Sequence, residues 1–140
     1  MSTVTVPAAP VRRVAPVVAW LAAGCGLVGA LPVAFFALFV GLLSLGYEDW
    51  RGAVLGAVPA VAFLLVLVGA VLLLTGRSWL VLVLGSALCV GFVGVGLAAG
   101  DLREDPAALL WLGGGPLLAV VLGSLPVVRH WVAARRAARG

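Results

Sequence analysis

Side chains with the chemistry for metal binding or redox reactions are few in this chain and lie far apart. It contains two cysteines, Cys25 and Cys89, and a single histidine, His130. Zinc sites and redox motifs need such groups clustered at defined spacing, and these three residues lie in separate stretches of sequence. We therefore predict no metal and no cofactor, and we interpret both cysteines as small buried hydrophobic side chains.

The acidic residues offer the best candidate for a polar cluster. They fall into two short groups, which comprise Glu48, Asp49, Asp101, Glu104 and Asp105. Carboxylate oxygens bind hard cations, so the two groups would form a cation site if they lay side by side. However, Asp105 before Pro106 is a usual helix start, and Glu48 and Asp49 suit the positive N-terminal end of a following helix. We favour helix capping, with cation binding and contact with a partner as alternatives.

Two glycine-proline elements are the third candidate. The sequence reads GAVP from Gly56 to Pro59 and GGGP from Gly113 to Pro116. Proline removes a backbone hydrogen bond and glycine lets a helix bend, so we predict a kink at the second element. Paired helix breaks in corresponding halves of a chain also mark the binding sites of transporters. The candidate residues for a solute site or hinge are therefore Gly56, Pro59, Gly113, Gly114, Gly115 and Pro116.

The composition decides which solvent surrounds these groups. Of the 140 residues, 64% are hydrophobic and only 10% are charged, and the mean hydropathy is +1.27. A soluble domain averages about half apolar and a quarter charged residues. A water-soluble globule of this size could not hide so much apolar surface, so we predict that the chain folds in lipid. The formal net charge is +4, but the charged residues are too sparse for binding to a nucleic acid.

Charged residues divide the chain into four apolar runs. Each run exceeds the roughly 20 residues that cross a bilayer, and backbone polar groups in lipid must bond within a helix. We predict an all-α integral membrane protein, a four-helix transmembrane bundle in a single domain over residues 14–132. The first run is too long for an upright span, so it must tilt, project from the bilayer or bend at Pro32. The predicted helices are 17–45, 52–75, 78–99 and 106–128.

The arginines predict an orientation. Seven of them flank the runs on one side: Arg12, Arg13, Arg77, Arg129, Arg135, Arg136 and Arg139. The other side carries every acidic residue, with only Arg51 and Arg103. Because positive residues stay on the cytoplasmic side, we expect both termini to be cytoplasmic. His130 then lies across the membrane from the acids, so no Ser-His-Asp set can form and we predict that the protein is not an enzyme.

The two ends of the chain differ in character. Residues 1–13 are predicted to be a disordered cytoplasmic tail, and residues 133–140 a basic cytoplasmic tail that can continue the fourth helix. Near anionic lipid each arginine adds about 1 kcal/mol of binding. We therefore interpret Arg135, Arg136 and Arg139 as anchors that face lipid. The alternative is that they dock an acidic cytoplasmic partner.

Small residues recur at a spacing of four in three of the predicted helices. Helices in lipid associate through close packing of such residues. We favour packing within one protomer, and the alternative is a stripe reserved for a second copy or a partner helix. The stripes are Ala22, Gly26, Ala30 and Ala34, then Gly52, Gly56 and Ala60, and finally Gly115, Ala119 and Gly123.

These observations predict a function through interaction. Ion-coupled transporters hold an ionisable residue within the bilayer, and the four predicted spans contain none. The length and helix number are similar to those of the small multidrug transporters, but those depend on a glutamate in the first helix, which this chain lacks. We predict an accessory or scaffold subunit without enzymatic activity, with membrane lipids and either a second copy or another membrane protein as partners. The alternative is a small oligomeric transporter or channel for an apolar or uncharged solute.

The amino-acid usage also indicates the source. The chain contains no Lys, Asn, Gln or Ile, and it is rich in the residues that GC-rich codons encode. This pattern is typical of a bacterium with a high-GC genome. We therefore expect a multi-pass protein of a bacterial inner membrane.

Overall fold

A computed structural model describes residues 11–47, 50–99 and 106–139, which form helices joined by short turns. The helices are α1 (Val11–Gly46), α2 (Trp50–Leu74), α3 (Leu80–Ala99), α4 (Pro106–Ser124) and α5 (Pro126–Ala137). The predicted all-α class is confirmed. Residues 11–13, which were predicted to belong to a tail, are part of α1, and the rest of that predicted tail lies outside the described residues.

The predicted end of the fourth helix was wrong. A helix to residue 128 and a tail from residue 133 were expected, whereas α4 ends at Ser124 and α5 runs from Pro126 to Ala137 at 60° to it. Pro126 lacks a backbone N–H, and its ring disfavours helical geometry in the preceding residue. Leu125 is accordingly extended, with φ −57° and ψ 138°. The last apolar run therefore contains a helix break.

Three helices are long and apolar enough to cross a membrane by themselves. These spans are Val14–Gly46, Trp50–Leu74 and Leu80–Ala98, and α4 with α5 is a fourth if the bent pair counts as one span. The chain is thus a multi-pass membrane protein. With 36 residues, α1 extends about 54 Å, well beyond the thickness of a bilayer core. It remains one helix although it contains Pro16 and Pro32.

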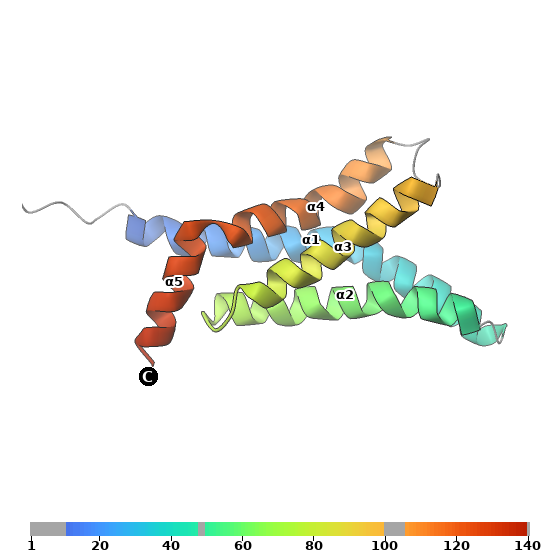
Figure 1. Ribbon diagram of the computed structural model, residues 1–140, viewed down its shortest axis with the longest axis horizontal. Coiled ribbons are helices and arrows are strands. Elements are labelled where there is room, and N and C mark those ends of the chain that lie inside the picture. Colours follow the sequence, from blue (N-terminus) through green and yellow to red (C-terminus); the bar gives the residue numbers. More distant parts are fainter. Residues whose placement is uncertain (1–10, 48–49, 100–105, 140) are drawn as a thin grey trace, which may run out of the picture.

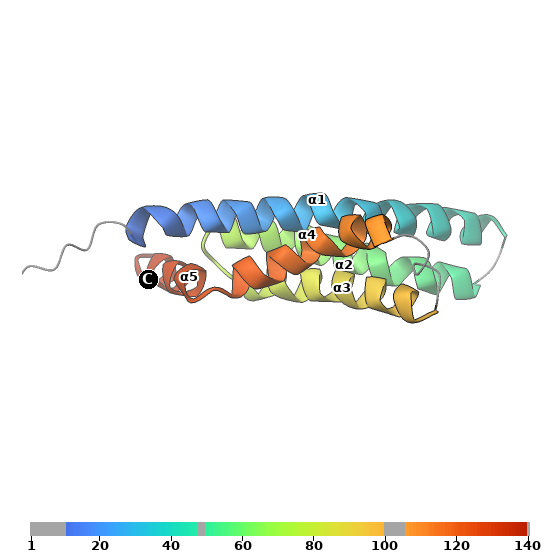
Figure 2. The ribbon, with the colours of Figure 1, turned by 90° about the horizontal axis from the view of Figure 1, so that it is seen from above.

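The first four helices pack in a ring, in which α1 contacts α2 and α4, and α3 contacts the same two helices. The start of α1, the turn between α2 and α3, and α5 lie at one end of the molecule, on the left in Figures 1 and 2. Toward the other end, α3 and α4 diverge from α1 and α2 (Figure 1). The five acidic residues lie outside the described residues, so helix capping and cation binding by them remain predictions.

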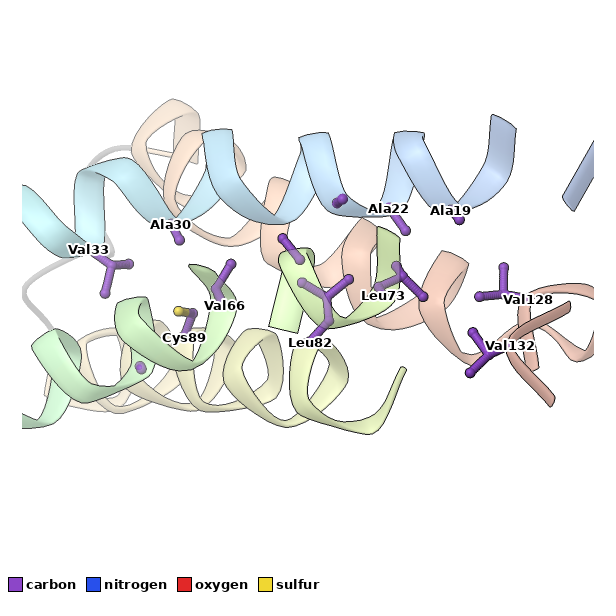
Figure 3. Packing of buried hydrophobic residues seen from close by; sticks show 13 residues of the cluster. Ala19, Ala22, Ala30, Val33, Val66, Leu73, Leu82, Cys89, Val128 and Val132 are labelled. Atoms are coloured by element: carbon purple, nitrogen blue, oxygen red, sulfur yellow. The ribbon is translucent and has the colours of Figure 1, made fainter. Parts of the chain in front are cut away.

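The buried core is built from small and medium apolar side chains on every helix. Figure 3 shows Ala22, Ala30 and Val33 of α1 opposite Val66 and Leu73 of α2, with residues of α3 and α5 closing the layer. Most large apolar side chains instead face outward, as Phe35 and Phe39 do. Lipid tails solvate such side chains, so helix association in a membrane depends on close packing rather than on hiding apolar area.

Candidate functional site

The closest approach between α1 and α4 involves backbone atoms of glycine. A Cβ atom added to Gly29 would lie 2.4 Å from Cδ of Pro116 and 2.6 Å from Cα of Gly115. A Cβ added to Gly115 would lie 2.8 Å from the carbonyl oxygen of Cys25. Real Cβ atoms do not tolerate such distances to backbone, so any side chain at Gly29 or Gly115 forces the two helices apart.

Two glycines join α2 to α3 in the same way. A Cβ added to Gly69 would lie 2.3 Å from the backbone nitrogen of Leu82, and one added to Gly85 would lie 2.6 Å from that of Val66. Neither glycine belongs to a stripe that the sequence analysis identified. The α2–α3 hairpin is therefore held by a pair of reciprocal glycine contacts. Gly69 lies about four helical turns along α2 from Gly56.

The two glycine-proline elements do not converge on one site. A Cβ added to Gly56 would lie 2.9 Å from the backbone nitrogen of Gly41. The second element instead contacts α1 at Gly29, about three turns or roughly 18 Å away along that helix. Both Pro59 and Pro116 are fully buried, and α4 stays helical throughout its GGGP segment. Each element thus serves a separate helix contact, and a common solute site or hinge remains a prediction.

Seven of the ten predicted packing residues are buried within the chain. Gly26 of α1 lies where four helices meet, because an added Cβ would be 3.2 Å from side-chain atoms of both Ala119 on α4 and Leu82 on α3, and 3.5 Å from one of Val66 on α2. By contrast, a Cβ on Gly114 would have no neighbour within 4 Å. The buried stripe residues are Ala22, Gly26, Ala30, Gly52, Gly56, Ala119 and Gly123, and the half-buried ones are Ala34, Ala60 and Gly115.

A groove of about 520 Å³ follows the outer side of the α1–α4 contact. Its residues are Trp20, Leu21, Gly24, Cys25, Val28, Gly29, Leu110, Trp111 and Gly115. The groove opens on the surface, since Trp20 and Trp111 are 66% and 76% exposed. Gly24 is exposed as well, and an added Cβ there meets nothing within 4 Å. A second groove of about 320 Å³ lies between α1 and α2 near Gly41 and Gly56.

Buried polar groups are scarce in the part of the chain that the structure covers. Ser44 and Ser86 are the buried polar side chains there, and the Oγ of Ser86 has no hydrogen-bond partner. Ser124 donates its hydroxyl proton to the carbonyl oxygen of Val120, one turn earlier. Both cysteines are free; Cys89 is buried as predicted, whereas Cys25 is half-buried beside the α1–α4 groove. Among the residues that the structure describes, no three His, Cys, Asp or Glu side chains lie close enough together to form a metal site.

The C-terminal end of α2 is finished by a glycine motif. Gly76 has φ +70°, and its N–H donates to the carbonyl oxygen of Leu73, while the N–H of Arg77 donates to that of Leu72. These two bonds are the pair that defines a Schellman motif, and they satisfy two of the four carbonyls that a helix end leaves open. The carbonyls of Leu74 and the residues after it need other donors.

Those donors are arginines of α5 and of the residues after it, which the sequence analysis interpreted as facing lipid. Arg135 donates to the carbonyl oxygen of Leu74 at 3.3 Å, Arg136 donates to that of Arg77, and Arg139 donates to that of Thr75. A guanidinium group at a helix C-terminus also meets the negative end of the helix dipole. The three side chains therefore clamp α5 to the end of α2, and their role as lipid anchors remains a prediction.

Replacing Gly76 by alanine should destabilise the protein by about 1–2 kcal/mol. A left-handed backbone conformation has this cost for residues with a Cβ, and the added atom would lie 2.8 Å from the flexible Arg135 side chain. The same exchange at Gly91, in an exposed and open position of α3, should be neutral or stabilising because alanine favours helices. Thermal unfolding of both variants in mild detergent measures whether Gly76→Ala lowers the stability while Gly91→Ala does not.

No known protein family, curated protein or solved structure matches this chain. Its function must therefore be inferred from its own geometry. Sequence reasoning missed the glycine contacts at Gly29, Gly69 and Gly85, and it missed the clamp by α5. The signal for the clamp was present, because Pro126 marks a helix break and four arginines follow it, three of which form the clamp.

Proposed function

We propose that this chain is an accessory or scaffold subunit of a bacterial inner membrane that acts through helix–helix contacts and has no enzymatic activity. In this proposal α1 to α4 form a four-helix transmembrane bundle, and both termini are cytoplasmic. The α1–α4 groove receives one transmembrane helix of another membrane protein. The observation that carries the proposal is that Gly24 exposes its backbone in that groove. It lies next to the close contact that Gly29 and Gly115 make between α1 and α4.

The geometry of the groove supports a helix as its occupant. Transmembrane helices approach each other most closely where small residues expose the backbone, and the groove presents such a surface at Gly24. Trp20 and Trp111 provide large exposed rings on the two helices that form it. In protein interfaces, aromatic anchors of this kind beside a small-residue surface supply much of the binding energy.

The interior supports a scaffold over the alternative transporter. Backbone contacts at Gly29, Gly69 and Gly85 bring the helices together at several levels, and the described interior offers only two buried hydroxyl groups to a passing solute. Both grooves open outward instead, to the surface that lipid or another helix covers. The charge pattern supports the orientation, because seven arginines belong to helix ends at one end of the molecule.

Gly24→Leu tests the proposal. A Cβ atom added at Gly24 has no neighbour within 4 Å and the side chain would extend into the groove, so the fold should keep its stability within about 0.5 kcal/mol. We expect a membrane protein that co-purifies with the wild type under gentle native conditions to be lost, as measured by mass spectrometry. Gly91→Leu makes the same exchange at an open position of α3 outside the groove, and it should retain the partner.

Two results would contradict the proposal. If Gly24→Leu retains every protein that the wild type retains, the groove is not a docking site. If the only protein that co-purifies with the wild type is a second copy of this chain, the groove is a homo-oligomer interface and the assignment as an accessory subunit is wrong.

A further inference from the structure

Five arginines belong to the turn between α2 and α3 or contact it. Arg77 belongs to that turn, and α5 with the residues after it brings Arg129, Arg135, Arg136 and Arg139 to it. We call these five residues the arginine cluster. Three of them are held in place by the carbonyl oxygens at the end of α2, and Arg129 lies with its Cζ 4.7 Å from the centre of the Trp79 ring. The cluster is thus a positioned set of donors and not a loose tail.

The carbonyl partners do not neutralise this charge. A guanidinium group has five N–H donors, and each clamping arginine is shown using one of them on a backbone oxygen. A helix C-terminus carries only about half an elementary negative charge, which is far less than the charge of five arginines. The cluster therefore needs anionic partners from elsewhere.

The chain's own carboxylates do not supply them. All five acidic residues belong to 48–49 and 101–105, beside the opposite ends of α2, α3 and α4. The 25 residues of α2 alone separate Trp50 from Leu74 by about 36 Å. That separation is several times the Debye length of roughly 8 Å at physiological ionic strength, so attraction over it is screened. Attraction between these acidic side chains and the arginine cluster is therefore too weak to neutralise it.

The tryptophans indicate the depth at which the arginine cluster lies. Trp79 and Trp131 are half-buried, and arginines stack on both rings, with Cζ of Arg135 4.4 Å from the centre of Trp131. Tryptophan at a helix end marks the headgroup level of a membrane. Helix α5 buries Val128 and Val132 on one face and lies at 60° to α4, as an amphipathic helix in the interface does.

We propose that the arginine cluster binds the phosphate of an anionic phospholipid headgroup. Arginine presents a planar fork that pairs with phosphate oxygens through two parallel hydrogen bonds, and here several forks lie together at headgroup depth. An acidic protein partner is the less favoured occupant, because the bend at Pro126 turns α5 across the end of the bundle instead of extending it into the cytoplasm. The proposal does not depend on the partner helix proposed for the α1–α4 groove.

The test compares two variants that remove the same charge from opposite ends of α2. The purified full chain is equilibrated with an equal mixture of phosphatidylglycerol and phosphatidylcholine, and the bound lipids are counted by native mass spectrometry. We expect the wild type to prefer phosphatidylglycerol and Arg77→Gln to weaken that preference about fivefold. Arg51→Gln should leave it unchanged. Arg77 contributes only its backbone oxygen to the clamp, so its substitution spares the three clamping side chains.

Three outcomes overturn the proposal. The wild type could show no preference for the anionic lipid, which would favour an acidic protein as the occupant. Arg77→Gln and Arg51→Gln could weaken the preference equally, which would mean a general effect of net charge. Inorganic phosphate, added at the concentration of the lipid, could displace phosphatidylglycerol completely, which would make free phosphate the ligand. Should Arg77→Gln fail to fold, Arg129→Gln carries the same test, since its shown contact is with the Trp79 ring.

Discussion

Gly29→Leu should lower the free energy of unfolding by about 3 kcal/mol, at the upper end of the usual cost of overpacking. The first added atom would lie 2.4 Å from Cδ of Pro116 and 2.6 Å from Cα of Gly115. A proline ring and a glycine backbone cannot rotate away, so α1 and α4 must separate along the length of their contact. Chemical unfolding of the purified chain in mild detergent measures the loss.

Gly24→Leu is the matched control for this prediction, because it makes the same exchange about one turn earlier on the same helix. An added Cβ at Gly24 has no neighbour within 4 Å, so the unfolding free energy should change by no more than about 0.5 kcal/mol. Equal stabilities of the two variants would show that α1 and α4 do not touch at Gly29.

Leu82→Ala should cost about 3 kcal/mol through the cavity that it leaves. Leu82 is fully buried on α3, and its Cδ1 reaches to within 3.2 Å of a Cβ added to Gly26 of α1. The backbone of α2 cannot move closer to fill the space, because Gly69 already holds it against the backbone of Leu82. Leu84→Ala, at a position that is 58% exposed on the same helix, should change stability little.

A double variant sharpens this second prediction. Gly26→Ala alone should destabilise by about 1 kcal/mol, since its methyl group meets both Leu82 and Ala119. In the background of Leu82→Ala the same methyl group enters the cavity, so its cost should vanish or become a gain. Additive effects of the two substitutions would contradict the contact between Gly26 and Leu82.

The helices could be predicted because charged residues are rare enough to delimit the apolar runs. The break near the C-terminus could not be predicted from those runs, since Leu125 to Val128 is as apolar as what precedes it. A kink was expected at Pro116 instead. The two prolines differ in their surroundings: Pro116 is buried against α1 within a continuous helix, whereas Pro126 is exposed at the start of α5.

The glycine contacts show a similar limit of sequence reasoning. With 19 glycines in the chain, many pairs have the spacing of a packing motif. The stripe chosen on α1 includes Gly26, which is a true meeting point, but the tightest glycine contact of α1 lies at Gly29 on an adjacent face. Which face of an apolar helix turns inward depends on its neighbours. In a helix that is apolar on every side, periodicity carries little information about that choice.

The clamp between α5 and the end of α2 has a consequence for the order in which the chain can mature. Arg139 donates to the carbonyl oxygen of Thr75, a residue that is synthesised 64 positions earlier. The end of α2 is therefore synthesised before its last arginine donors exist, and it lacks these donors until α5 and the residues after it have been made. Shortening the chain before Arg135, or fusing a bulky tag close behind Arg139, would consequently act on the turn between α2 and α3.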